Sequence, residues 1–216
     1  MIIHDHPQGS EQWQAARVGV VTASRFKDCR DRLKPAKGET VGKPSAKFLA
    51  YAAQIAVERI AGRPIDKVFE NWQMREGVEQ EPFARQAYDI ETGHIVQECG
   101  LITTEDGAFG YSPDGLIGAD GLLEIKTIVS ADRIVKIIAD KDLSDFMDQC
   151  LGGLWITGRQ WVDLVLWAPA LEPAGRHLTI HRIERDESAI EALEADLIDF
   201  ARLADEKHRA LTGGLK

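Results

Sequence analysis

The segment from His94 to Thr127 constrains the fold most, because short apolar runs alternate there with the signals of tight turns. It reads HIVQECGLITTEDGAFGYSPDGLIGADGLLEIKT, with Asp-Gly or Pro-Asp-Gly between the runs. Such turns join neighbouring antiparallel strands. We therefore predict a three-stranded meander, with strands over about residues 95–103, 107–112 and 121–127.

Helical patterns flank the predicted meander on both sides. Before it, residues that can cap a helix stand at Ser10, Thr22 and Ser45. A further helix is expected from about Trp72 to Tyr88, with the side chains of Phe83, Ala84 and Ala87 directed inward. After the meander come helices near 131–139 and 144–156, strands within 160–169 and 176–184, and a C-terminal amphipathic helix. The order predicts an α/β (α+β) fold, a single domain over residues 1–216 with a central mixed β-sheet flanked by helices.

Three polar residues interrupt the apolar pattern at the end of this segment: Asp114, Glu124 and Lys126. Alternate residues of a strand point to the same face, so Glu124 and Lys126 should project together while Ile125 points to the opposite layer. Asp114 can face the same pocket from the end of the neighbouring strand. Two close carboxylates repel each other unless a cation lies between them, and Mg²⁺ is commonly bound by one or two carboxylates. The alternative is a polar turn followed by a strand with an exposed Glu–Lys pair.

The distribution of charge is uneven along the chain. The net charge is −9, yet residues 17–47 hold nine lysines and arginines against three acids, a net of +6, so that the remainder carries −15. A local positive field can attract a phosphate backbone even when the whole protein is acidic. The alternative is a solvated helix and loop. The three cysteines are scattered, which favours buried free thiols over a disulfide or metal framework. Neither a membrane-spanning apolar run nor a signal peptide is visible, so we expect a cytoplasmic protein without a membrane partner.

The spacing Pro113-Asp114, a gap and then Glu124-Ile125-Lys126 resembles the signature of the PD-(D/E)xK nucleases. Three further blocks resemble the lambda exonuclease and YqaJ-like viral recombinase family in the same order along the chain. They are WQAARVGVVTASRF (13–26), GVEQEPFARQAY (77–88) and MDQCLGGLWITG (147–158). The four blocks cover roughly residues 8–160, and they imply a restriction-endonuclease-like core.

The resemblance also implies roles for particular residues. Metal binding is implied for Asp114, Glu124, the main-chain carbonyl of Ile125, and Glu81, with Glu79 as the competing choice on the same helix. Lys126 is the implied catalytic lysine, and Gln149 matches a glutamine that orders the attacking water.

Arg17 and Ser24 match residues that hold the 5′-phosphate of the substrate. A guanidinium can grip a phosphate with two parallel hydrogen bonds, and a serine at a helix start adds a donor. Without the resemblance, a surface cation and an ordinary helix residue are the simpler interpretations of these two positions.

Taken with the resemblance, the sequence predicts a Mg²⁺-dependent, processive 5′→3′ exodeoxyribonuclease that degrades the 5′-phosphorylated strand of linear double-stranded DNA. The implied setting is phage or prophage recombination by strand annealing, with two Mg²⁺ per active site (Mn²⁺ as an alternative). A homotrimeric ring and a single-strand annealing partner protein are implied as well. The competing predictions are a PD-(D/E)xK endonuclease or repair nuclease, and a non-catalytic protein that binds DNA ends or a partner.

Overall fold

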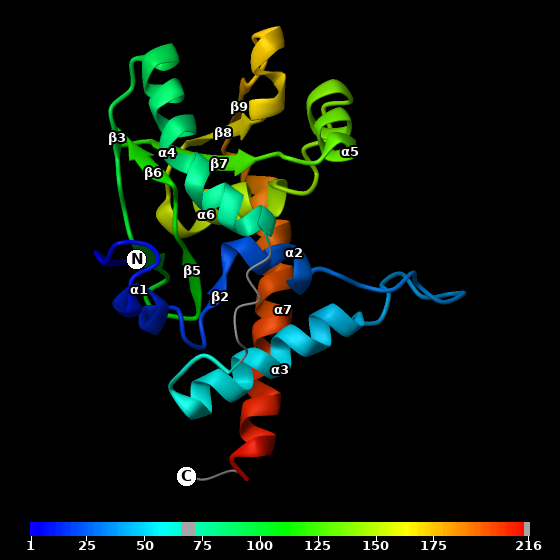
Figure 1. Cartoon of the computed structure of the whole chain (residues 1–216). Coiled ribbons are helices and arrows are strands. Elements are labelled where there is room, and N and C mark those ends of the chain that lie inside the picture. The colour runs from blue at the N-terminus through cyan, green and yellow to red at the C-terminus, as the bar shows by residue number, and fades with distance from the viewer. Residues whose placement is uncertain (66–71, 214–216) are drawn as a thin grey trace. The chain divides into compact units, whose positions relative to one another are not determined.

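The computed structural model describes residues 1–65 and 72–213, and the chain divides into two compact units (Figure 1). The first unit is built from Met1–Lys67, Gly100–Ser112 and Asp186–Lys216, and the second from Val68–Cys99 and Pro113–Arg185. The prediction of one nuclease domain over residues 1–216 stays a prediction. In the described part of the chain, no helix is both long and apolar enough to cross a bilayer.

The first unit contains a four-stranded mixed sheet in the order β1-β4-β5-β2. These strands are β1 (Ile2–His4), β4 (Leu101–Thr103), β5 (Phe109–Tyr111) and β2 (Val21–Thr22), and only the β2–β5 pair is parallel among the pairs of this sheet. The helical elements of this unit are α1 (Glu11–Ala16), η1 (Ala23–Arg25), α2 (Phe26–Cys29), α3 (Ala46–Ala61) and α7 (Glu187–Leu211).

Side-chain caps and an aromatic contact explain where the helices of the first unit begin and how the two longest pack. Ser10 and Ser45 accept backbone N–H hydrogen bonds at the starts of α1 and α3, as predicted. Thr22 precedes η1 but makes no side-chain capping bond there. Phe48 of α3 meets Phe200 of α7 with ring centroids 5.0 Å apart, in an edge-to-face arrangement that buries both rings.

The second unit contains a five-stranded mixed sheet in the order β3-β6-β7-β8-β9. Its strands are β3 (Val96–Gln97), β6 (Gly115–Ile117), β7 (Gly121–Thr127), β8 (Trp161–Trp167) and β9 (Leu178–Glu184). The β7–β8 pair is parallel, with Glu124 aligned to Leu164, and its neighbours on both sides are antiparallel. The helical elements are α4 (Trp72–Thr92), α5 (Ala131–Ile134), η2 (Val135–Ala139), α6 (Met147–Thr157) and η3 (Pro169–Ala174).

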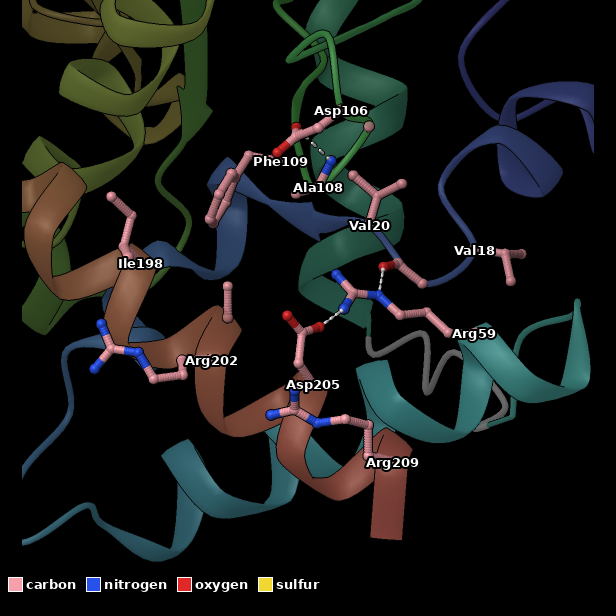
Figure 2. A pocket seen from close by; sticks show the side chains of 13 residues that line it. Val18, Val20, Arg59, Asp106, Ala108, Phe109, Ile198, Arg202, Asp205 and Arg209 are labelled. Atoms are coloured by element: carbon pink, nitrogen blue, oxygen red, sulfur yellow. Dashed lines mark hydrogen bonds and ion pairs between the residues drawn. The ribbon is translucent and has the colours of Figure 1, made fainter. Parts of the chain in front are cut away.

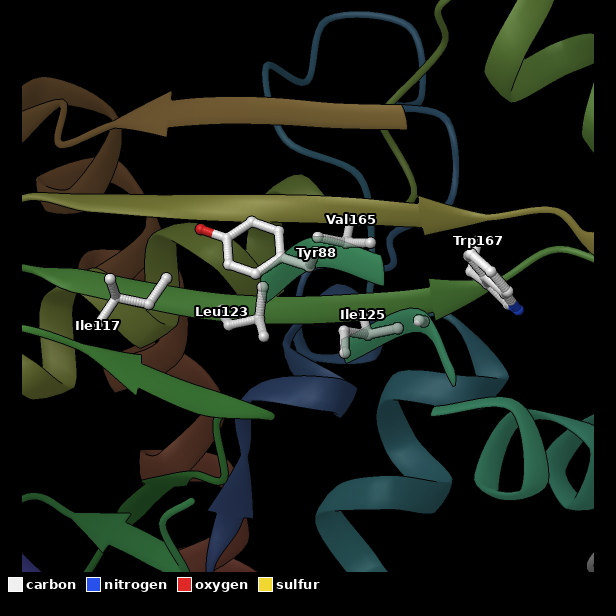
Figure 3. Close-up of a cluster of buried hydrophobic side chains, with 7 residues drawn as sticks. Tyr88, Ile117, Leu123, Ile125, Val165 and Trp167 are labelled. Carbon is white, nitrogen blue, oxygen red and sulfur yellow. The ribbon is translucent and has the colours of Figure 1, made fainter. Parts of the chain in front are cut away.

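One face of this second sheet forms an apolar core with helix α4 (Figure 3). Leu123 and Ile125 of β7 lie in this cluster beside Tyr88 and Ala84 of α4. Because side chains alternate along a strand, Glu124 and Lys126 belong to the opposite face. That face carries α6, whose Gln149 side chain reaches Glu124.

The predicted α/β (α+β) class with a mixed sheet flanked by helices is confirmed, but the predicted meander is divided between two sheets. Strands β4 and β5 pair antiparallel as predicted, whereas β5 and β7 lie in different sheets. The segment 95–103 contains two strands of different sheets, since β3 pairs with β6 while β4 pairs with β1 and β5. The chain passes from one unit to the other between Cys99 and Gly100. A Cβ atom at Gly100 would lie 2.1 Å from the carbonyl oxygen of His4, so only glycine fits this passage. The strand over Gly115–Ile117 was not predicted separately.

The inward face of α4 also differs from the prediction at one position. Ala84 is buried and Ala87 packs against the core, as expected, but Phe83 is 59% exposed. Tyr88, four residues beyond Ala84, occupies the inward position instead. The three cysteines are free and buried, as predicted.

Candidate active site

Strand register brings Asp114 and Glu124 to the same place on the second sheet. Gly115 is paired with Leu123 in the antiparallel β6–β7 ladder, so one step further along the ladder sets Asp114 across from Glu124. The backbone N–H of Asp114 donates to the carbonyl of Leu123 at 3.1 Å, which extends the ladder to this residue. The Asp114 carboxylate also accepts a hydrogen bond from the N–H of Ile125. The aspartate is thus fixed at both its backbone and its side chain.

The Glu124 carboxylate is buried and has two protein donors on one oxygen. Its Oε1 atom lies 2.7 Å from Lys126 Nζ and accepts a hydrogen bond from Gln149 Nε2 at 2.6 Å. The Glu124 side chain is 2% exposed, whereas that of Lys126 is 26% exposed. A buried carboxylate would be costly without such donors. The structure therefore brings together Asp114, Glu124, Lys126 and Gln149, four of the residues singled out in the sequence.

The pKa values of both Asp114 and Lys126 are raised in this cluster. Burial, and next the charge of Glu124, raise the pKa of Asp114 well above its usual range, and Glu81 adds to the effect. Burial lowers the pKa of Lys126, but the charges of Glu124 and Asp114 outweigh it, so the pKa of the ammonium is raised. Lys126 therefore stays protonated at neutral pH, and negative charge at Asp114 is unfavourable without a further cation.

Glu81 lies on α4, close enough for its charge to act on Asp114. Its carboxylate is bound at 2.6 Å by Arg85, one helical turn further on. Glu79, the competing choice, is exposed. The structure thus favours Glu81 over Glu79 as the helical acid of this site.

No ready-made metal cluster accompanies these residues in the described ranges 1–65 and 72–213. Within them, no three His, Cys, Asp or Glu side chains come close enough together to hold one metal ion. The metal-binding roles of Asp114, Glu124, Ile125 and Glu81 therefore stay predictions.

Arg17 and Ser24 belong to the first unit, not to the sheet that carries the acidic residues. The Arg17 guanidinium lies over the Trp13 ring, 4.2 Å from its centroid, and burial lowers the pKa of Arg17. The Ser24 side chain is exposed, and its hydroxyl lies 3.4 Å from that of Thr22. Arg17 and Ser24 flank strand β2 in the chain, and their role in phosphate binding remains a prediction.

A pocket of about 670 Å³ lies in the first unit and contains none of the predicted site residues (Figure 2). Arg59 crosses it to Asp205 at 2.6 Å and also donates to the carbonyl of Gly19 at 2.9 Å. Asp106, on another wall, accepts from the N–H of Ala108 at 3.0 Å. These three charged groups of the pocket are thus already paired within the protein.

Comparison with known proteins decides the family. The model of the YqaJ-like viral recombinase domain matches residues 12–160. The chain belongs to the YqaJ-like viral recombinase family. An alkaline exonuclease from Laribacter hongkongensis, LHK-Exo, resembles this YqaJ-like protein with 34% sequence identity and a TM-score of 0.80, over 94% of this chain and 96% of its own.

Two further structures extend the comparison of this YqaJ-like protein. LHK-Exo in complex with dAMP matches at a TM-score of 0.79 and 34% identity, over 96% of this chain and 100% of its own. A phage-related exonuclease from Haemophilus somnus 129PT matches at a TM-score of 0.66 over 91% of this chain and 96% of its own, and at 15% identity it shows a shared fold. No curated protein matches the sequence. The predicted family is confirmed, and the chain is placed among alkaline exonucleases.

Two sets of residues in this YqaJ-like protein were not predicted from its sequence, one beside the acidic site and one on the α4 face of the second sheet. Arg85 pairs with Glu81 at the i,i+4 spacing, a signal that was present in the sequence. Tyr88, Asp163 and Arg182 form a second network, in which the Tyr88 hydroxyl donates to Asp163 at 2.6 Å and Arg182 binds the same carboxylate through two nitrogens at 2.8 Å. No short-range pattern predicts that network, because its members lie on three separate elements.

Proposed function

We propose that this protein is a Mg²⁺-dependent exonuclease that digests the 5′-phosphorylated strand of linear double-stranded DNA processively from its 5′ end. The product is a duplex with a 3′ single-stranded overhang, the substrate for recombination by strand annealing. The observation that carries the proposal is the Glu124 carboxylate, buried opposite Asp114 and bound by Lys126 and Gln149. A relative with 34% identity binds dAMP, the kind of mononucleotide that digestion of DNA from an end releases.

The chemistry of the donor set suits a hard divalent cation. Asp114 and Glu124 offer carboxylate oxygens, the ligands that Mg²⁺ prefers, and burial together with the charge of Glu124 raises the pKa of Asp114. In the proposal Asp114, Glu124, the carbonyl of Ile125 and Glu81 hold two Mg²⁺ ions, with Mn²⁺ as a substitute. Bound Mg²⁺ supplies an activated water and stabilises the leaving oxygen of an in-line displacement.

The protein's own residues then orient the reacting groups. Lys126 is protonated and partly exposed, so its ammonium can stabilise charge that develops on the scissile phosphate. The Gln149 amide, held by Glu124, can hold the attacking water through its oxygen while its nitrogen donates to the carboxylate.

The remaining elements of the proposal concern the substrate and the assembly. Arg17 and Ser24 hold the 5′-phosphate, and the positive segment over residues 17–47 contributes attraction for the DNA backbone. A homotrimeric ring would keep the protein on its DNA between cuts, and a single-strand annealing protein would receive the overhang. Support for these two partners comes from the family alone.

The test is digestion with Mg²⁺ of a linear duplex and of a covalently closed circle of the same sequence. We expect the unaltered protein to digest the linear DNA and to leave the closed circle intact. Glu124→Gln should slow digestion of the linear DNA by about 100-fold or more. Glu172→Gln, which removes an exposed acid of the same unit, is the matched control and should leave the rate unchanged.

Cutting of closed circles would replace the proposal by an endonuclease or repair nuclease. Absence of cutting by the unaltered protein, with DNA binding retained, would replace it by a role in binding DNA ends or a partner.

A further inference from the structure

Helix α4 carries an ion pair that the proposed chemistry does not use. Arg85 Nη2 lies 2.6 Å from Glu81 Oε1, and both side chains are largely buried, with 18% and 35% of their surfaces exposed. The glutamate precedes the arginine by four residues, the better orientation for such a pair on a helix.

The second contact of Arg85 is weaker than the first. Its Nη1 atom lies 3.2 Å from Glu98, whose side chain is 85% exposed. This contact lacks hydrogen-bond geometry, and Nη1 is buried with no hydrogen-bond partner among the described residues. Exposed ion pairs contribute little. The main partner of Arg85 is therefore Glu81.

Each carboxylate of the acidic site is bound by different protein groups. Glu124 is bound by Lys126 and Gln149, Asp114 accepts a hydrogen bond from the N–H of Ile125, and Glu81 forms an ion pair with Arg85. A cation bound by Glu81 would share this carboxylate with Arg85, and because the two positive charges repel each other, the ion pair opposes binding of the cation.

Helix α4 is anchored through side chains on both sides of this pair. Before it, the side-chain amide oxygen (Oε1) of Gln80 accepts a hydrogen bond from Trp167 Nε1 at 3.0 Å. After it, the buried Tyr88 hydroxyl donates to Asp163 at 2.6 Å. A change of partner at Glu81 can therefore occur through side-chain rotation while the helix stays in place.

We infer that Arg85 is a positioning residue that holds Glu81 at the acidic site and competes with the divalent cation for its carboxylate. Arg85 thereby lowers the affinity of the DNA-free site for the cation. The inference rests on the proposed function, because it takes Glu81, with Asp114 and Glu124, as one of the residues that hold the two proposed cations.

The test is calorimetric titration of Mn²⁺ into the DNA-free protein, with and without Arg85→Gln. Loss of the competing charge should lower the Kd by about two- to fivefold, the range for a partly exposed ion pair. In the Glu81→Gln background the same substitution should change the Kd by less than about twofold, since the shared carboxylate is absent. Arg75→Gln, at an exposed position of the same helix, and Glu98→Gln should leave the Kd unchanged.

A purely structural role predicts a different result: Arg85→Gln would lower the melting temperature in EDTA and leave the Kd for Mn²⁺ as it is. That outcome, or an equal change in the Glu81→Gln background, would overturn the inference. If Arg85→Gln does not fold, Arg85→Lys takes its place in the titration. Lysine keeps the charge but lacks the planar fork of arginine, so this variant should bind Mn²⁺ with a Kd between those expected for the unaltered protein and for Arg85→Gln. Absence of Mn²⁺ binding by the unaltered protein would instead refute the cation site itself, and the inference with it.

Discussion

At the scale of single residues, two buried glutamates, Glu124 and Glu58, are each matched with nearby hydrogen-bond donors. Glu124 has Lys126 and Gln149, and Glu58 accepts from the N–H of Gly19 at 3.1 Å and from Gln54 at 2.9 Å. Such pairing offsets the cost of removing a charge from water. Glu58 serves the fold through a backbone donor, whereas the donors on Oε1 of Glu124, from Lys126 and Gln149, are side chains that a substrate or cation can displace.

The residues of the acidic site were also the part most open to prediction from sequence. The period of two along a strand predicted that Glu124 and Lys126 share a face and that Ile125 lies in the core, and both are observed. The side-chain bond from Gln149 was not predictable from spacing, because it depends on how α6 lies on the sheet.

Tyr51 provides a prediction about stability at high pH. Burial raises the pKa of Tyr51 to about 12, and its hydroxyl accepts a hydrogen bond from the N–H of Thr22 at 3.0 Å. Between the ordinary tyrosine pKa of about 10 and this value, the unfolded chain loses the proton and the folded chain keeps it. The free energy of unfolding should therefore fall as pH rises through this range, by up to about 1.4 kcal/mol per pH unit from this residue.

Urea denaturation at several pH values, with the unaltered protein and Tyr51→Phe, measures this contribution. The variant should start less stable, because the Thr22 N–H loses its acceptor, but should decline less steeply above pH 10. Equal slopes for the two proteins would show that Tyr51 ionises at its ordinary pKa.

At the scale of elements, the length and start of the helices were more predictable than the pairing of the strands. Ser45 caps α3 through the N–H of Phe48, and Gly62 ends it in a left-handed conformation. Those signals lie within a few residues of the helix ends. The pairing of β3 with β6 and of β4 with β1 depends on contacts far apart in the chain, so the apolar pattern over residues 95–103 could not reveal that it contains two strands.

The anchoring of α4 to the sheet can be tested at Asp163. This carboxylate is buried on β8 and binds both the Tyr88 hydroxyl of α4 and Arg182 of β9. Asp163→Ala removes all of these bonds and leaves a buried hydroxyl without its acceptor, so we expect a loss of about 2–4 kcal/mol in the free energy of unfolding.

The loss should appear in urea denaturation, and Asp199→Ala, at an exposed surface pair, should change stability by less than about 0.5 kcal/mol. A stability close to that of the unaltered protein would mean that the Tyr88–Asp163–Arg182 network does not hold the helix.

At the scale of the whole molecule, positive charge is concentrated in one segment of an acidic chain. The segment over residues 17–47 has a net charge of +6 within a chain of −9. Part of this charge is already paired, since Arg25 binds Asp28 and Arg30 binds Asp196 at 2.8 Å. The sequence shows where the positive charge lies in the chain, but the partner Asp196 is far away in sequence and was not predictable.

We propose that one strand of DNA is cut at the site of Glu124 and Lys126, with its 5′-phosphate recognised at Arg17 and Ser24. The most direct measurement follows both strands of a linear duplex in Mg²⁺, with a 5′-phosphate at one end and a 5′-hydroxyl at the other. It compares the unaltered protein with Lys126→Ala, Arg17→Ala and the control Lys136→Ala, which removes a surface ammonium paired with Asp145.

We predict rapid loss of the phosphorylated strand alone, a fall of about 100-fold or more with Lys126→Ala, and no change with Lys136→Ala. Arg17→Ala should remove the preference for the phosphorylated strand and leave the chemistry intact. Equal loss of both strands in the unaltered protein, or full activity of Lys126→Ala, would contradict the account.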